Sequence, residues 1–340
     1  MKVLLGMSGG LDSTYSAKKL IDAGHEVVGA VLKMHEYTDV DCAISAAKAL
    51  GIEIVVIDCE KKFEDNVIKP FADEYFRGRT PNPCIICNST VKFRVLLDYA
   101  DKNGFDAIAT GHYAHVEREG ERYFITMAKD KKKDQSYVLW RLGQDILSRL
   151  VLPVGDVEKS TVREISRIEE LPSADAEESQ EICFIHGENY SDYLERRFGK
   201  SQSGDFIDGH GNILGRHKGI IRYTVGQRKG LGIALGKRMF VSSMNPKNNT
   251  VTLTDVQKSD ECEIYVDNIV FSGMKAPKTG DRIELGVRLR YQSPILSASV
   301  EFITEKRAKV KVHATSLYPT PGQSAVFYEG RKVMFGGFIR

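Results

Sequence analysis

The segment Met7-Ser8-Gly9-Gly10-Leu11-Asp12-Ser13 lies between a short apolar strand pattern, residues 2–6, and a helical pattern that Gly24 ends. Two adjacent glycines allow a tight turn that brings backbone N–H groups close to an anion. The hydroxyls of Ser8 and Ser13 and the positive end of the following helix add to this effect. The sequence therefore predicts a phosphate-binding loop, in which Asp12 suits a magnesium ion bridging the phosphates.

Other interpretations of this loop explain less of it. A Walker loop is excluded, because no Gly-Lys-Ser/Thr follows the glycines. The segment 6–10 also matches the G-x-S-x-G elbow of the α/β-hydrolases, which would make Ser8 a nucleophile but gives Asp12 no role. A plain strand-to-helix turn needs the glycines but not the serines and the aspartate around them.

Strand and helix patterns alternate through the first half of the chain. Strands apolar on both faces, alternating with helices, are typical of a doubly wound parallel α/β sheet. Ligands of such sheets bind beyond the carboxyl ends of the strands, here the loops after Gly6, Leu32, Ile57 and Thr110. The expected strands are 2–6, 27–32, 52–57 and 106–110, and the expected helices are 13–23, 41–50, 63–76 and 91–102.

The second half of the chain has a different residue pattern. From about Gly199 glycines become dense and the strand patterns short and antiparallel, and from about Glu263 only short strands and turns remain. A small barrel or sandwich is the natural interpretation of the last part. We therefore predict a catalytic α/β domain over 1–198, a small central β-rich domain over 199–262 and a C-terminal β-barrel over 263–340.

Composition sets broad limits on the function. A length of 340 residues suggests two or three domains, and 42% hydrophobic and 28% charged residues are ordinary for a soluble globular protein. We expect a cytoplasmic protein with no membrane partner, because no run of about 18 apolar residues exists and residues 1–7 lack signal-peptide features. A net charge of +2 neither requires nor excludes nucleic acid, since a local basic patch suffices.

Two of the cysteine-containing segments are the candidates for reactive thiols. Thr80-Pro81-Asn82-Pro83-Cys84-Ile85-Ile86-Cys87 leads into a helix, at whose start the dipole should lower the pKa of the Cys87 thiol. The second segment runs from Ser179 to His186 and contains Cys183. A thiolate can carry a persulfide sulfur or bind a metal. Structural zinc held by Cys84, Cys87, Cys183 and His186 is the main alternative.

The chain resembles known families in these segments. Ser8-Gly9-Gly10-Leu11-Asp12-Ser13 is similar to the pyrophosphate loop (PP-loop) of the ATP pyrophosphatases, which cleave ATP between its α and β phosphates and adenylate an oxygen. Over essentially the whole chain, the resemblance narrows to the tRNA-specific 2-thiouridylases. The matching segments are 6–13, 80–93, 109–114, 133–137, 179–185, 223–232 and 321–323, among which Gly226 to Gly232 and the Thr-Pro-Asn-Pro loop are the most specific.

This resemblance implies roles for individual residues. Cys87 and Cys183 would be the catalytic pair, with Cys183 receiving a persulfide from a sulfur-donor protein and Cys87 acting as the partner thiol. The C-terminal barrel would dock the anticodon stem-loop of tRNA. The implied ATP contacts are Gly6, Met7, Ser8, Gly9, Gly10, Leu11, Asp12, Ser13, Met34 and Gly111, with Mg²⁺ beside Asp12. The implied tRNA contacts are Asn82, Pro83, Cys84, His112, Lys133, Asp134, Gln135, Arg290, Tyr291 and Gln323.

Cys84 departs from the better-known family pattern, which has an aspartate at this position. A thiol cannot replace a carboxylate as a general base at neutral pH unless it is ionised. Cys84, Cys87 and Cys183 could instead hold three irons of a [4Fe–4S] cluster, whose open iron would bind free sulfide. Both routes for sulfur are compatible with the sequence, and the cluster is slightly favoured.

The expected reaction starts with the C2 oxygen of the wobble uridine attacking the α-phosphate of ATP, with loss of pyrophosphate. Sulfur then displaces AMP and gives 2-thiouridine. The alternatives are another PP-loop tRNA thiolase, a zinc-stabilised tRNA-binding protein without ATP turnover, and a serine hydrolase acting on esters.

Overall fold

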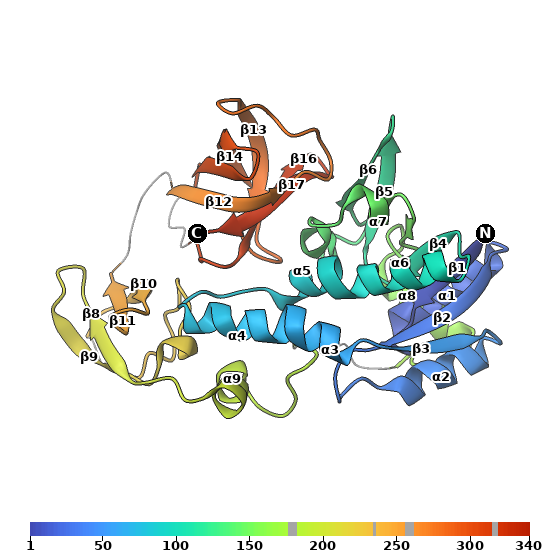
Figure 1. The fold of residues 1–340 in the computed structure, drawn as a ribbon, viewed down its shortest axis with the longest axis horizontal. Coiled ribbons are helices and arrows are strands. Elements are labelled where there is room, and N and C mark those ends of the chain that lie inside the picture. Colours follow the sequence, from blue (N-terminus) through green and yellow to red (C-terminus); the bar gives the residue numbers. More distant parts are fainter. Residues whose placement is uncertain (176–181, 234–235, 256–261, 315–318) are drawn as a thin grey trace.

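The computed structural model describes residues 1–175, 182–233, 236–255, 262–314 and 319–340. Three parts follow one another along the chain: an α/β domain, a small β-rich region and a barrel, and helix α4 extends from the α/β domain towards the β-rich region (Figure 1). Within the described residues, no helix is long and apolar enough to cross a membrane.

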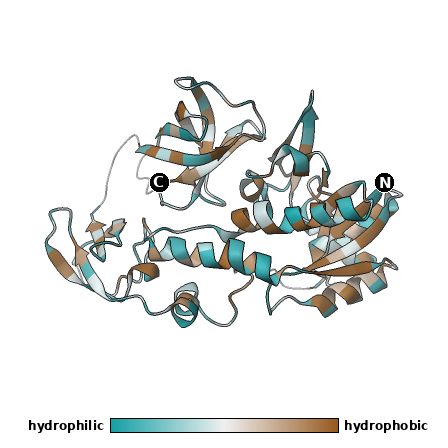
Figure 2. Ribbon diagram, viewed as in Figure 1, coloured by the Kyte–Doolittle hydropathy of each residue, from teal (hydrophilic) through white to brown (hydrophobic). Residues whose placement is uncertain are grey.

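The first domain contains a five-stranded parallel sheet in the order β3-β2-β1-β4-β7. The predicted doubly wound fold is confirmed, and the order reverses at β1, where ligands of such sheets bind. Figure 2 shows that the sheet strands are largely hydrophobic, as expected between two layers of helices. The strands are β1 (Lys2–Gly6), β2 (Glu26–Lys33), β3 (Ile54–Asp58), β4 (Ala107–Thr110) and β7 (Leu150–Val151).

Alternating side chains of these strands pack into separate clusters on the two faces of the sheet. Val3 and Leu5 pack with buried residues of α1 and α2, while Leu4 packs with Phe63 and Leu96 on the opposite face. This period of two is what a strand buried on both faces requires. The covering helices of the domain are α1 (Leu11–Asp22), α2 (Val40–Ala49), α3 (Glu60–Phe63), α4 (Lys69–Phe76), α5 (Pro83–Cys87), α6 (Phe93–Lys102), α7 (Gln144–Leu147) and α8 (Lys159–Ile168).

Two of the expected helices are interrupted by π-helical turns. The turn 64–68 joins α3 to α4, and the turn 88–92 joins α5 to α6. The second helical segment therefore begins at Pro83 rather than near residue 91, because Asn82 caps it by accepting a hydrogen bond from the Cys84 N–H at 3.1 Å. π-Helical turns are often found at functional sites.

The central region forms a four-stranded sheet in the order β10-β11-β8-β9. We expected only antiparallel pairs here, but β8 and β11 pair in parallel, with Val251 opposite Phe206. A sequence pattern reveals antiparallel pairs between neighbouring strands joined by a turn. It does not reveal a parallel pair between strands that are far apart in the chain, such as β8 and β11. The elements are α9 (Tyr190–Phe198), β8 (Gly204–Ile207), β9 (Ile213–His217), the 3₁₀ turn Ile220–Arg222, β10 (Phe240–Asn245) and β11 (Thr250–Thr254).

The C-terminal part is a closed antiparallel barrel, as predicted. Six strands follow the order β12-β15-β14-β13-β16-β17, and pairing of Val266 with Ile339 between β12 and β17 closes the ring. Its core includes the ring of Phe335, which packs against the rings of Phe302 and Phe327. The strands are β12 (Cys262–Val270), β13 (Arg282–Arg288), β14 (Leu296–Thr304), β15 (Arg307–Val312), β16 (Ser324–Glu329) and β17 (Lys332–Ile339).

The first domain and the barrel share a sheet and a buried interface. The hairpin β5 (Ala114–Glu119) and β6 (Arg122–Met127) extends the barrel sheet, since the Met127 N–H donates to the Arg331 carbonyl at 2.9 Å. After this hairpin, the 3₁₀ turn Ser136–Leu139 leads to Trp140, which is fully buried and donates its indole N–H to Ser324 Oγ at 3.1 Å. The barrel is therefore packed firmly against the α/β domain.

Candidate active site

A cavity of about 780 Å³ opens at the carboxyl ends of the parallel strands. It lies where the sheet topology predicted a ligand, beyond β1, β2 and β4. Most of the predicted site residues come together in its wall. Those that line it are Ser8, Gly10, Leu11, Asp12, Ser13, Met34, Asn82, Pro83, Cys84, Cys87, His112, Lys133, Gln135, Cys183, Tyr291 and Gln323.

The predicted phosphate-binding loop, residues 7–13, is shaped by close backbone contacts. Gly9 has φ of +77°, and a Cβ there would lie 2.5 Å from the carbonyl carbon of Cys42. A Cβ at Gly111 would lie 2.9 Å from the carbonyl carbon of Asp12. Only glycine permits both approaches. Gly9 and Gly111 thus allow neighbouring segments to pack closely against the loop. Gly6 ends β1, and Met7 leads from it into the loop.

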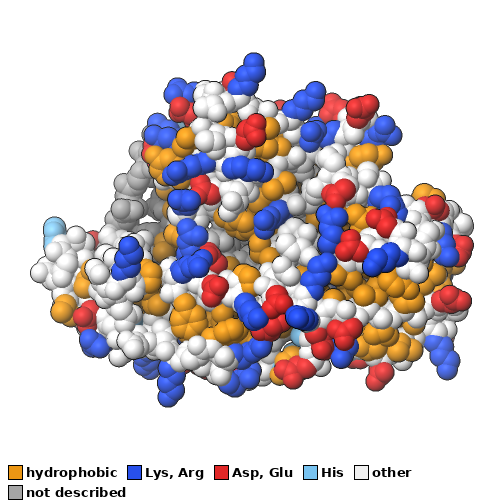
Figure 3. Space-filling model, viewed as in Figure 1, with side chains coloured by type: hydrophobic (Ala, Val, Ile, Leu, Met, Phe, Trp, Pro, Cys, Tyr) orange, Lys and Arg blue, Asp and Glu red, His pale blue; other side chains and the backbone are white. Residues whose placement is uncertain are grey.

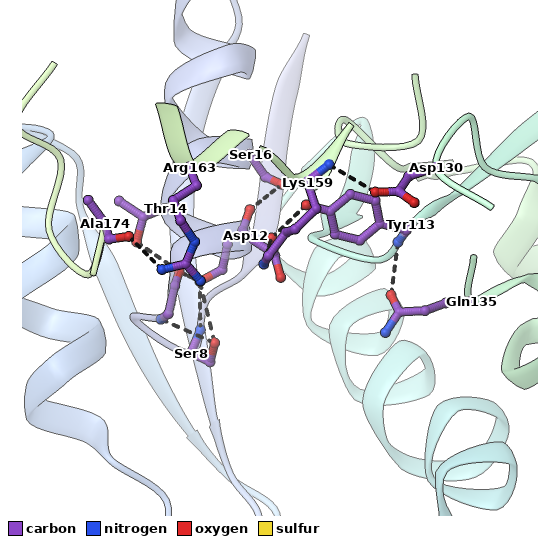
Figure 4. Close-up of polar contacts among 12 residues, drawn as sticks. Ser8, Asp12, Thr14, Ser16, Tyr113, Asp130, Gln135, Lys159, Arg163 and Ala174 are labelled. Atoms are coloured by element: carbon purple, nitrogen blue, oxygen red, sulfur yellow. Dashed lines mark hydrogen bonds and ion pairs between the residues drawn. The ribbon is translucent and has the colours of Figure 1, made fainter. Parts of the chain in front are cut away.

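Asp12 has cationic and hydroxyl partners. Its Oδ1 accepts a hydrogen bond from Lys159 Nζ at 2.5 Å and another from the Tyr113 hydroxyl at 2.8 Å (Figure 4). Gln135 holds Tyr113 by accepting from its backbone N–H at 2.9 Å. Asp130 accepts from the Lys159 N–H at 3.1 Å, at the N-terminal end of α8. A metal ion bound at Oδ1 would therefore compete with Lys159 for the same atom.

Lys159 and Arg163 were missed by the sequence analysis. They are four residues apart on α8, so they lie on the same helix face, and both line the cavity beside the loop. Arg163 donates to the Ala174 carbonyl at 3.1 Å, and Figure 4 shows its side chain directed towards the loop near Ser8. The only sequence signal was the four-residue spacing, which is equally common on solvated helices.

The three cysteines of interest meet in the same cavity. Cys84 lies in the first turn of α5, Cys87 at its last residue, and Cys183 on the segment that follows the first gap in the described residues. The Cys87 sulfur lies 3.8 Å from the Met34 sulfur. Residues 179–181 of the second cysteine motif lie outside the described part of the chain.

The expected lowering of the Cys87 pKa by the helix dipole is wrong. Desolvation in the cavity raises the pKa of Cys87 to about 11, and it raises that of Cys183 to about 12 with a further contribution from Cys87. Cys87 lies at the end of the short helix α5, not at its start, so the favourable end of the dipole is distant. Desolvation also raises the pKa of Cys84.

We expect alkylation to report these raised pKa values. At pH 7.5 Cys87 should react with iodoacetamide about 100-fold more slowly than free cysteine, because a pKa of about 11 leaves far less thiolate. The rate should rise about tenfold per pH unit between pH 7 and 10, since a raised pKa delays ionisation to higher pH. Peptide mass spectrometry measures the rate, with circular dichroism confirming that the fold persists. A rate that levels off below pH 8 would contradict the raised pKa.

The cysteines do not form a ready-made metal site. Among the described residues, which include Cys84, Cys87, Cys183 and His186, there is no group of three or more potential ligands that could hold a metal ion. The His186 ring packs against Tyr37, with centroids 4.8 Å apart. The arrangement thus fits neither a tetrahedral zinc nor a preassembled cluster, and it leaves three thiols facing one cavity.

Several of the predicted RNA contacts have partners within the protein. Asp134 is buried and forms an ion pair with Arg288 of the barrel at 3.1 Å. Arg290 donates to the Val225 carbonyl at 2.9 Å, and Gln323 donates to the Thr80 carbonyl at 2.7 Å. These side chains join domains in this structure, so direct contact with RNA would require them to exchange partners.

His112 is held as a neutral imidazole. Its Nδ1 lies 2.8 Å from Thr110 Oγ1, and its ring packs on Phe93 with centroids 5.5 Å apart. Burial, together with the charge of Lys92, holds the pKa of His112 well below its usual value. An uncharged ring can accept or donate one hydrogen bond towards a base in the cavity.

Three family models match consecutive parts of the chain. They are the tRNA methyl transferase HUP domain over residues 1–187, the tRNA methyl transferase PRC-barrel domain over 191–255 and the aminomethyltransferase beta-barrel domain over 261–339. These matches, together with the fold, define a HUP-domain protein of the tRNA-modifying class.

Curated relatives narrow this class. "tRNA-specific 2-thiouridylase MnmA 3" of Bacteroides fragilis is 43% identical over 347 residues, covering 99% of this chain and 94% of the relative. "tRNA-specific 2-thiouridylase MnmA 2" of Clostridium botulinum is 40% identical, covering 99% of both chains. The chain belongs to the family of tRNA-specific 2-thiouridylases.

Proposed function

We propose that this protein is an ATP-dependent tRNA 2-thiouridylase, acting in the cytoplasm on the wobble uridine. The observation that carries the proposal is the convergence of a phosphate-type glycine loop and three thiols on one cavity. The family's curated relatives carry the name of this activity. A nucleotide on the loop and a base against the cysteines would be close enough to react.

The loop and α8 suit the adenylation step. The N–H groups at the start of α1, together with Lys159 and Arg163, provide positive potential for the phosphates and for the departing pyrophosphate. The C2 oxygen of uridine attacks the α-phosphate, and the bond between the α and β phosphates breaks. Such chemistry depends on positioning and electrostatics more than on a protein nucleophile.

Asp12 could pair with either Lys159 or Mg²⁺ in this step. In this structure its Oδ1 accepts from Lys159. Asp12 would hold Mg²⁺ at the loop, and Lys159, no longer paired with Asp12, would face the phosphates. Mg²⁺ would supply charge neutralisation between the phosphates when bound.

Cysteine-borne sulfur fits the described geometry better than a preassembled cluster does. The terminal sulfur of a persulfide on Cys183 attacks C2 of the adenylated uridine, and AMP leaves. The Cys87 thiolate then attacks the Cys183 sulfur, which gives a Cys87–Cys183 disulfide and releases 2-thiouridine. A two-electron thiol reductant restores the pair. The raised pKa of the Cys87 thiol means that this group must lose its proton as it attacks.

A [4Fe–4S] cluster is the second candidate, and the third thiol, Cys84, favours it. Cys84, Cys87 and Cys183 would hold it once their segments close together, and it would bind sulfide at an open iron. Anaerobic purification with iron, sulfide and zinc analysis distinguishes the two routes. About four irons per chain with absorption near 400 nm would favour the cluster, whereas metal-free protein that still thiolates tRNA would favour the persulfide.

The surface around the cavity suits an RNA partner. Figure 3 shows Lys and Arg side chains along the hollow between the barrel and the rest of the molecule. Lys92 and Lys133 line the cavity itself. Phosphates of an anticodon stem-loop would meet this charge, and the half-buried Tyr291 could stack on an extruded base. The barrel is the proposed docking domain.

The proposal is tested with purified protein, ATP, Mg²⁺, a sulfide or persulfide donor and a tRNA transcript with uridine at the wobble position. We expect pyrophosphate release and 2-thiouridine in the nucleoside digest. A transcript with cytidine at that position should give neither. RNA binding without pyrophosphate release would indicate a binding protein instead, and ester hydrolysis without ATP would indicate a hydrolase.

A further inference from the structure

All three parts of the chain meet at Thr80, just before the cysteine helix α5. The Thr80 N–H donates to the Pro321 carbonyl at 2.8 Å, and the Thr80 carbonyl accepts from Gln323 Nε2 at 2.7 Å. Its hydroxyl lies 3.2 Å from the hydroxyl of Thr224 in the central region. The backbone donor, the backbone acceptor and the side chain of one residue are thus each bonded to another domain.

On the barrel side of this junction, the turn 320–323 is held by close packing and by backbone hydrogen bonds. Gly322 has φ of +91°, and a Cβ there would lie 3.0 Å from the Thr80 nitrogen, so the two segments approach as closely as glycine allows. The Gly322 N–H donates to the Ile339 carbonyl at 2.9 Å, and the Ile339 N–H donates to the Gln323 carbonyl at 2.8 Å. The turn 320–323 is therefore tied to the last strand of the barrel, β17.

The segment between Thr80 and the cysteines is short and stiff. Pro81 and Pro83 restrict the backbone on both sides of Asn82, which caps α5 by accepting from the Cys84 N–H at 3.1 Å. Thr80 precedes Cys84 by four residues, and Cys84 and Cys87 are three apart on the same helix face. A displacement of the Thr80 carbonyl would thus reach both thiols.

We propose that Gln323 is a positioning residue for the cysteine helix: its carboxamide holds the Thr80 carbonyl and thereby fixes Cys84 and Cys87 in the cavity before RNA arrives. The barrel thus sets the geometry of the thiols in addition to docking substrate. This inference rests on the proposed function in taking these thiols as the sulfur site. It differs from a contact between Gln323 and tRNA, which would act only in the complex.

The first test uses the full-length protein without tRNA. Gln323→Met keeps the size of the side chain but removes the N–H donor, and Gln323→Glu sets a carboxylate against the Thr80 carbonyl. We expect iodoacetamide to alkylate Cys84 about fivefold faster in Gln323→Met, the factor that loss of one net hydrogen bond gives, and faster still in Gln323→Glu. The exposed Gln202, replaced by alanine, is the control and should leave the rate unchanged.

Kinetics separate positioning from RNA contact. For Gln323→Met we expect kcat for thiolation to fall about fivefold while KM for tRNA changes less than about twofold. A raised KM with unchanged kcat and unchanged alkylation would overturn the proposal in favour of an RNA contact. Unaltered melting temperature excludes general unfolding. If the wild-type protein does not thiolate tRNA, the proposed function fails, while the alkylation comparison still decides the role of Gln323.

Discussion

Replacing Asp12 by asparagine is expected to lower tRNA-dependent pyrophosphate release from ATP by about 100-fold or more, the usual scale for losing a preorganised electrostatic group. Asparagine keeps an oxygen that can accept from Tyr113 and Lys159, so the local structure should persist. It removes the negative charge that would hold Mg²⁺ at the loop. Pyrophosphate release at saturating ATP and tRNA measures the effect.

A matched substitution on the same helix controls for this experiment. Asp22 lies at the end of α1, away from the loop, and pairs with Lys18 at 2.5 Å on the surface. Asp22→Asn should retain full activity, because exposed ion pairs of this kind contribute little. Wild-type pyrophosphate release by Asp12→Asn would remove Asp12 from the site and with it the proposed position of the phosphates.

Adding one methyl group at Gly336 is expected to destabilise the interface between the barrel and the α/β domain. A Cβ there would lie 2.5 Å from Cδ2 of Trp140 and 2.8 Å from its Cγ. The indole cannot easily move, because it is fully buried and donates to Ser324 Oγ. We expect Gly336→Ala to lower the free energy of unfolding by about 2–3 kcal/mol, the usual cost of overpacking. Urea titration followed by tryptophan fluorescence measures it, since Trp140 is the single tryptophan.

Gly209 provides the control for this prediction. It has no atom within 4 Å of an added Cβ, and Gly209→Ala should change stability by less than about 0.5 kcal/mol. Equal urea midpoints for Gly336→Ala and the wild type would show that the interface between the α/β domain and the barrel tolerates the methyl group. The close packing of Trp140 on β17 would then be unimportant for stability.

Much of the first domain was predictable, because local patterns specify it. Residues 2–6 and 27–32 are apolar on both faces, so they were identified as buried parallel strands, and the glycine loop between strand and helix marked the ligand end of the sheet. The barrel was predicted from its short strands and turns. The hairpin at 114–127 was not identified, although β5 and β6 pair locally. Its pairing with the barrel sheet has no local signal, because the partner strand β17 lies about two hundred residues away.

Some residues of the candidate site were also predictable from local motifs, and others were not. Asp12, Cys84 and Cys87 belong to short motifs, and their position in the cavity follows from those motifs. Lys159 and Arg163 reach the loop only because α8 packs beside α1, which no local pattern shows. The Cys87 pKa was predicted in the wrong direction, because a helix dipole is a local property whereas desolvation depends on every neighbouring segment.

The sequence by itself determined the parallel sheet, the phosphate-binding loop, the C-terminal barrel and the resemblance to the thiouridylases, since each was inferred from motifs and patterns that are individually no longer than about a dozen residues. The tertiary structure alone decided which distant groups meet. It set Lys159 against Asp12, Gln323 against the carbonyl before the cysteine helix, and Trp140 against Gly336. Such contacts depend on how whole elements pack, and packing is a property of the folded chain rather than of any segment.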